Sequence, residues 1–161
     1  MISTFLVEHP WLTSVALLAV LVVGPVLAYA LANHVRVAWW LAGISFVVVI
    51  VITMYPESRV VEPGCEVSLP NLSLGAVESI ANVILFVPPV LFAAVASRRP
   101  LIALAGGVAL SALIELVQLA APVIGRSCDT SDWITNAIGA AISAAVAALG
   151  LRLAASRRRA R

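Results

Sequence analysis

Two sets of polar residues flank one short loop in an otherwise apolar sequence. The first is Ser111, Glu115 and Gln118, spaced i, i+4, i+7, and the second is Asp129, Asp132 and Asn136, spaced i, i+3, i+7. Either spacing places the side chains of a set along one face of a helix. Carboxylates and amides can bind amines or hydroxyls, and Arg126 in the loop adds a cation suited to phosphate or carboxylate. Residues 110–143 are therefore the candidate functional segment.

The composition is that of an integral membrane protein. The 161 residues are 62% hydrophobic and 11% charged, with a mean hydropathy of +1.08, whereas roughly a quarter of the residues of soluble domains are charged. A membrane-spanning helix needs about 20 apolar residues. We expect an all-α fold, a polytopic bundle of about five transmembrane helices in a single domain. Nucleic acid is not an expected partner.

Five apolar runs give the expected spans. They are residues 11–32, 37–55, 76–96, 101–121 and 132–153, with the longer loops at 56–75 and 122–131. Glu8 and His9 precede the first run where a secretion signal would carry basic residues. We therefore interpret this run as a retained span.

The arginines predict the orientation of the bundle. Eight fall on one side of the five spans: Arg36, Arg98, Arg99, Arg152, Arg157, Arg158, Arg159 and Arg161. Only Arg59 and Arg126 fall on the other side. Because basic loops remain cytoplasmic, the C-terminus is expected inside and the N-terminus outside the cell. The bias to arginine and alanine is typical of a high-GC bacterium, so we expect a multi-pass protein of the bacterial plasma membrane.

The same orientation puts both cysteines outside. Cys65 and Cys128 would then share an oxidising compartment, where disulfides persist. We predict that they form a disulfide. The alternative is that they are two unrelated small residues.

The third span is expected to complete a polar crevice that opens outward. Glu78 and Asn82, spaced i, i+4, lie in its outer half. Deeper in the membrane, four small residues are expected to bring the last two spans close together: Gly139 and Ser143 on one, Gly107 and Ser111 on the other.

Simpler roles are available to most of these polar residues. Asp129 and Asp132 can cap the last helix, and Arg126 can pair with either of them. Asn136 and Gln118 can form hydrogen bonds between helices, which contribute about 1 kcal/mol or less. A purely structural role is hardest to assign to Glu115. Placing an acid within a membrane span costs about 2.5 kcal/mol or more, so such a residue is typical of a functional site.

Residues 71–143 resemble the VanZ-like family of small membrane proteins. Three blocks carry the resemblance: Asn82-x3-Phe86-x-Pro88, Ser111-x3-Glu115-x2-Gln118, and Gly125-Arg126-x2-Asp129-x2-Asp132-x3-Asn136-x2-Gly139-Ala140. Val90 and Ser143 stand where the family usually has glycine. The founding member is associated with resistance to teicoplanin, a glycopeptide antibiotic with a lipid tail. The resemblance thus implies tolerance of such antibiotics, without a defined reaction.

Several functions are compatible with these residues. The first hypothesis is a binding protein without cofactor, metal or catalytic residues. Its crevice would hold the head group of a membrane lipid, a lipid-linked cell-wall precursor or a lipoglycopeptide. The second is an intramembrane enzyme whose acids bind a divalent cation, although Ser111 and Ser127 lack a matched base. An ion-coupled carrier and a purely structural membrane protein are further alternatives. The oligomeric state is not predicted.

Overall fold

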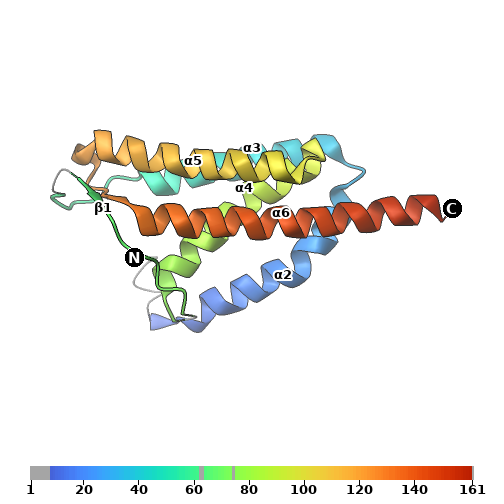
Figure 1. Ribbon diagram of the computed structural model, residues 1–161, viewed down its shortest axis with the longest axis horizontal. Helices are drawn as coiled ribbons and strands as arrows, with labels where there is room; N and C mark the ends of the chain where they lie inside the picture. The colour runs from blue at the N-terminus through green and yellow to red at the C-terminus, as the bar shows by residue number, and fades with distance from the viewer. Residues whose placement is uncertain (1–7, 62–63, 74, 161) are drawn as a thin grey trace.

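The computed structural model describes residues 8–61, 64–73 and 75–160. Its main elements are α2 (Trp11–Leu31), α3 (Val35–Met54), α4 (Val77–Ser97), α5 (Pro100–Ala120) and α6 (Thr130–Arg159). All five helices are long and apolar enough to cross a membrane, and they lie side by side as a bundle (Figure 1). The predicted all-α, polytopic fold is confirmed. The predicted loop 56–75 includes residues 62, 63 and 74, which are outside the described ranges.

The last helix is longer than expected. The first four helices begin and end within two residues of the predicted bounds, but α6 extends from Thr130 to Arg159. Asp129 starts it early because its side chain accepts a hydrogen bond from the Ser131 N–H at 2.7 Å. The arginine-rich tail continues it, since arginine and alanine favour helix and cations are stable near a helix C-terminus.

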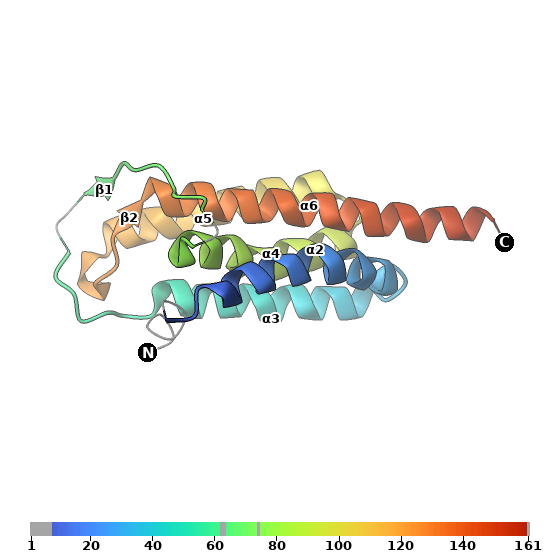
Figure 2. The same ribbon diagram turned by 90° about the horizontal axis from the view of Figure 1, so that it is seen from below.

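α4 is the central helix of the bundle. It packs against each of the other four, and Figure 2 shows it between α6 and the pair α2 and α3. Phe86 of α4 is fully buried against Val49 of α3 and Ile114 of α5. In a second buried cluster, Ala28 of α2 and Ala147 of α6 pack with Leu91 and Val95 of α4.

Gly139 and Ser143 of α6 face α4, so the prediction that these two residues face α5 is wrong. A Cβ atom on Gly139 would overlap the backbone carbonyl of Val83 in α4. The Ser143 hydroxyl lies within hydrogen-bonding distance of the Val87 carbonyl oxygen of α4, at 3.2 Å. The reason is that residues as small as glycine and serine let the backbones of two helices approach closely, and here the neighbouring backbone is that of α4.

Gly107 of α5 also makes room for α4. A Cβ atom there would be 2.6 Å from a methyl carbon of Val90 in α4 and 3.1 Å from the Cβ of Ala140 in α6. Gly107 therefore leaves room for the side chain of Val90, which is buried in the bundle.

The two longer connections are joined at one end of the bundle, which we call the loop end. Strands β1 (Cys65–Glu66) and β2 (Cys128–Asp129) pair in parallel, and Cys65 and Cys128 form the predicted disulfide there. β2 follows the short 3-10 helix η1 (Pro122–Ile124). Ser68 and Thr130 add a reciprocal pair of hydrogen bonds of 2.9 Å. The loop that precedes α4 is thus fixed to the start of α6.

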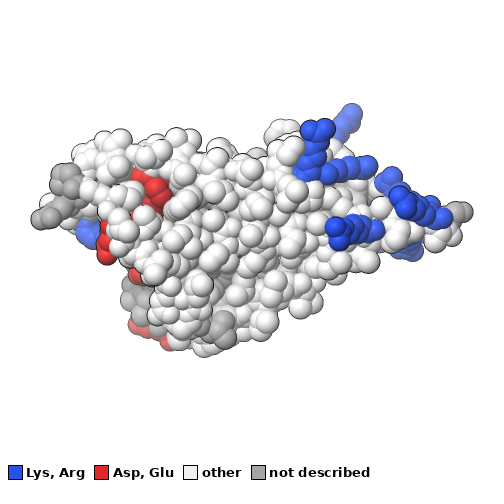
Figure 3. Space-filling model, in the orientation of Figure 1, with Lys and Arg blue, Asp and Glu red and all other residues white. Residues whose placement is uncertain are grey.

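Charge is segregated along the bundle. Figure 3 shows arginines at the end that carries the C-terminus and acids at the loop end. We call the former the arginine end; its described arginines are Arg36, Arg98, Arg99, Arg152, Arg157, Arg158 and Arg159.

Candidate functional site

Glu115 is buried at the loop end, where α5 meets β2. The residue is only 7% exposed, and its carboxylate accepts a hydrogen bond from the Asp129 N–H at 2.9 Å. The Asp129 carboxylate in turn accepts hydrogen bonds from the Ser131 N–H and the Ser68 hydroxyl, both at 2.7 Å. Asp129 therefore has the capping role that its spacing allowed, and it also fixes the loop before α4.

Asp132 lies in the first turn of α6, one turn beyond Asp129. Its carboxylate accepts a hydrogen bond from the Asn82 amide of α4 at 2.7 Å. The charges of Asp129 and Glu78 repel that of Asp132, and the more distant charge of Arg126 attracts it. The charges of Asp132 and Asp129 repel that of Glu115. We call Glu78, Glu115, Asp129 and Asp132 the acidic cluster. None of the four forms an ion pair within the described residues.

Ser111 and Asn136 form a deeper polar contact between α5 and α6. Both residues are buried, at 0% and 3% exposure, and the Asn136 amide donates to the Ser111 hydroxyl at 3.0 Å. The expected interhelical role of Asn136 is thus present. Its carbonyl oxygen, Oδ1, is buried without a hydrogen-bond partner among the described residues.

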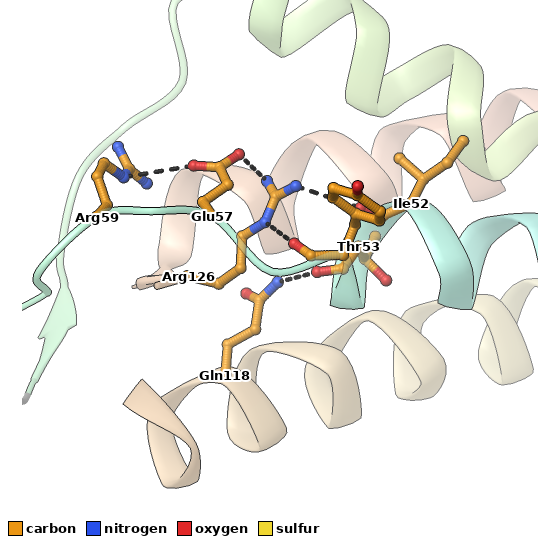
Figure 4. Close-up of polar contacts among 7 residues, drawn as sticks. Ile52, Thr53, Glu57, Arg59, Gln118 and Arg126 are labelled. Carbon is orange, nitrogen blue, oxygen red and sulfur yellow. Dashed lines mark hydrogen bonds and ion pairs between the residues drawn. The ribbon is translucent and has the colours of Figure 1, made fainter. Parts of the chain in front are cut away.

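Arg126 does not pair with Asp129 or Asp132, so the alternative role considered for it from the sequence is wrong. Figure 4 shows its guanidinium against Glu57, with an Nη1 to carboxylate distance of 3.0 Å. The same group donates to the backbone carbonyls of Ile52 and Tyr55 at 3.3 and 3.2 Å. The physical reason is that the last carbonyls of α3 have no partner within the helix, and the five donors of a guanidinium can satisfy them.

Gln118 makes the same kind of contact. Its amide donates to the Thr53 carbonyl at 3.0 Å, so Gln118 and Arg126 together fasten the end of α3 to α5 and the following loop (Figure 4). Gly125 allows this turn because it has a φ of +70°, and a Cβ atom there would overlap the Glu57 carbonyl.

The nine predicted residues therefore share the loop half of the bundle but form three groups. Glu78, Asn82, Glu115, Asp129 and Asp132 gather around the start of α6. Ser111 and Asn136 lie one turn deeper, and Gln118 and Arg126 lie against α3. Among the described residues, no three His, Cys, Asp or Glu side chains are placed to hold a metal ion. The first group offers chiefly hydrogen-bond acceptors.

A family model described as VanZ/LLP1 matches residues 40–151, well over half of the sequence. The chain belongs to the VanZ/LLP1 family. The match contains all nine predicted site residues and both cysteines, and it confirms the resemblance stated from the sequence. Comparisons with curated proteins and with solved structures found no match. The protein is a multi-pass VanZ-like membrane protein of a family linked to resistance.

Three residues within the VanZ/LLP1 match contribute to the site and were missed from the sequence. Glu57 holds Arg126, Ser68 holds Asp129, and Thr130 fixes the loop that contains Ser68. Their polar side chains were visible, but Glu57 and Ser68 lie in loops without helical periodicity, and Thr130 is the first residue of α6. Only the packing of those loops on the bundle shows which residues they contact.

Proposed function

We propose that this VanZ-like protein contributes to antibiotic resistance as a non-enzymatic binding protein. The acidic cluster would receive the head group of a lipid-tailed molecule, either a lipid-linked cell-wall precursor or a lipoglycopeptide such as teicoplanin. One observation carries the proposal. Four carboxylates gather at the loop end without an ion-pair partner in the described chain, and one of them, Glu115, is buried within a span. A buried acid without an ion-pair partner in a membrane is expensive and is typical of a functional site.

The cluster favours amines and hydroxyls over phosphate. Carboxylates are acceptors and form their strongest hydrogen bonds with ammonium and guanidinium groups. Arg126, the one cation of the predicted site, is already engaged by Glu57 and two carbonyl groups. We therefore assign Arg126 a positioning role and assign ligand contact to the acids. The proposed ligand presents an amine or sugar hydroxyls to the protein.

The proposal requires the loop end to face away from the cytoplasm. Two features support that orientation. Seven described arginines lie at the opposite end, which is the cytoplasmic side under the positive-inside rule. The disulfide between Cys65 and Cys128 lies at the loop end and would persist in an oxidising compartment. Reporter fusions after residue 125 and after residue 160 test the orientation directly.

Teicoplanin tolerance of cells that express the protein is the test of the binding site. We expect Glu115→Gln and Asp132→Asn to lose any tolerance that the wild-type protein confers, at equal amounts in the membrane. Glu8→Gln is the matched control, because Glu8 is an exposed acid outside the cluster. Full tolerance in both cluster variants would overturn the proposed site.

An intramembrane enzyme that acts on a lipid-linked envelope intermediate is the second candidate. It is favoured by the proximity of Glu115 to the carboxylates of Asp129 and Asp132, since paired carboxylates can act as general acid and base. Incubating purified protein with lipid-linked cell-wall precursor distinguishes the two functions. Binding without any change in precursor mass supports the binding protein, and a new product that Glu115→Gln fails to make supports the enzyme.

A further inference from the structure

A groove opens between α5 and α6 at the arginine end, far from the acidic cluster. Its volume is about 540 Å³. Its main lining residues are Leu101, Leu104, Ala145, Ala148, Arg98 and Arg152. The groove therefore combines an apolar interior with two cationic side chains.

The sequence of α6 produces the apolar floor. Ala141, Ala145, Ala148 and Arg152 are spaced i, i+4, i+7 and i+11, so they follow one face of the helix and lead to the arginine. Alanine side chains leave space between the helices. Opposite them, Leu101 of α5 is 78% exposed and contributes an apolar wall.

The two arginines differ in how they are held. The Arg98 guanidinium donates to the Ala32 carbonyl of α2 at 3.1 Å, which fixes its position and leaves other N–H groups available. Arg152 is exposed and makes no hydrogen bond or ion pair with any described residue. The two guanidinium groups thus have unused donors beside the same groove.

No acid of the described chain can neutralise these charges. The only ion pairs found there join Arg59 and Arg126 to Glu57, at the loop end. Figure 3 shows basic side chains without acidic ones over the arginine end. Within the described residues, Arg98 and Arg152 therefore have no acidic partner, and an anion from the surroundings can supply the counter-charge.

We propose that this groove binds one anionic phospholipid of the surrounding leaflet. The lipid phosphate lies between Arg98 and Arg152, where charge-assisted hydrogen bonds to guanidinium are strong. One acyl chain lies along the alanine floor. Basic pockets between helices at the cytoplasmic side of membrane proteins bind anionic head groups in this way. The inference does not depend on the proposed function, because it involves neither the acidic cluster nor its ligand.

The apolar interior identifies a lipid rather than a free phosphate ion. An inorganic anion would contact the two arginines but would leave the apolar part of the groove, at Leu101 and Ala145, unfilled. A phospholipid fills both parts of the groove with one molecule. The charge and the hydrocarbon of the lipid can be tested separately.

Lipid retention by purified protein in detergent, measured by native mass spectrometry, provides the test. Phosphatidylglycerol is the anionic probe and phosphatidylcholine the zwitterionic one. We expect the wild-type protein to retain one phosphatidylglycerol molecule, and Arg152→Gln to weaken that binding by about tenfold or more through the lost charged hydrogen bonds. Arg159→Gln is the matched control: it also removes one arginine of α6, but Arg159 does not line the groove.

A second variant tests the acyl chain. Ala145→Trp fills the groove and retains both arginines, and we expect it to weaken phosphatidylglycerol binding as strongly as Arg152→Gln. Ala145 is exposed, so the larger side chain does not enter the core, and Ala141→Trp repeats the test on the same face if folding is altered. Equal losses of phosphatidylglycerol binding in Arg152→Gln and Arg159→Gln would overturn the proposal. They would mean that the lipid is attracted by the general positive charge of this end and not by the groove. Unchanged binding in the filled variants, or complete displacement of the lipid by inorganic phosphate, would overturn it as well.

Discussion

The Glu115 carboxylate accepts a hydrogen bond from the backbone N–H of Asp129 at 2.9 Å, and so joins α5 to the residue that caps α6. Glu115→Ala would leave that N–H without its partner. We expect the variant to lose about 1–3 kcal/mol of unfolding free energy, the cost of an unsatisfied buried polar group. Glu115→Gln keeps an acceptor oxygen and should be much less destabilised. Reversible unfolding in detergent micelles measures both.

The two Glu115 variants separate folding from function. If the carboxylate serves only to hold Asp129, the glutamine variant should keep both stability and antibiotic tolerance. If it also binds a ligand, the glutamine variant should stay folded and lose tolerance. Equal stability of Glu115→Ala and the wild-type protein would contradict the structural role.

The disulfide between Cys65 and Cys128 closes a loop across 63 positions of sequence. We expect the denatured wild-type protein to take up a thiol-alkylating reagent only after reduction, with two labels per chain detected by mass spectrometry. Cys65→Ala should take up one label without reduction. For a soluble chain, closing a loop of this length stabilises by about 4 kcal/mol. The effect here should be smaller, because transmembrane helices persist in the unfolded state and already restrict the chain.

Labelling of both cysteines in the unreduced wild-type protein would contradict the disulfide. The variant Cys65→Ala also serves as a control for access of the reagent, since it leaves Cys128 as the one cysteine of the sequence.

The sequence alone predicted the helices and the common location of the polar residues. Hydropathy determines the spans, and antiparallel connection of successive spans brings Glu115 and Asp132 to the same end. Spacing also predicted that Asp129 could cap α6. These features depend on local sequence and on the order of the elements, which a single sequence contains.

Contacts that depend on tertiary packing could not be predicted. Spacing indicated that Gly139 lies on a small face of α6, but not that α4 rather than α5 would occupy it. Charge suggested an acidic partner for Arg126, but Glu57 is 69 positions away by residue number and follows the end of α3. Arg126 pairs with Glu57 because the free carbonyl groups at the end of α3 lie next to Glu57 and bind the same guanidinium. The periodicity of the sequence does not reveal this arrangement.

Arg126 stabilises the end of α3 and the loop after it. We expect Arg126→Ala to accelerate amide hydrogen exchange at Glu57 and in the last turn of α3 by about tenfold or more, since it removes a charged pair and two hydrogen bonds to carbonyl groups. The Glu57 N–H, which donates to the Ile124 carbonyl at 2.9 Å, is the most informative site. Exchange in detergent, followed by mass spectrometry, measures the effect.

Arg59→Ala is the control for this prediction. Arg59 also contacts Glu57, but at 3.4 Å and with a side chain that is 62% exposed. Exposed ion pairs contribute little. Similar exchange rates in the two variants would show that Arg126 does not hold the end of α3.

The contact of Gly139 with the Val83 carbonyl predicts opposite effects for two glycine-to-alanine substitutions. At Gly139 the added methyl group overlaps backbone atoms of α4, which cannot move without separating two central helices. We expect Gly139→Ala to lose about 1–3 kcal/mol of unfolding free energy through overpacking. Gly106 lies within α5, and a methyl group added there would meet no neighbouring atom within 4 Å. Gly106→Ala should therefore be neutral or gain up to about 1 kcal/mol from helix propensity. Unfolding of both variants in the same detergent makes the comparison, and a stable Gly139→Ala protein would mean that α4 and α6 are not packed through this glycine.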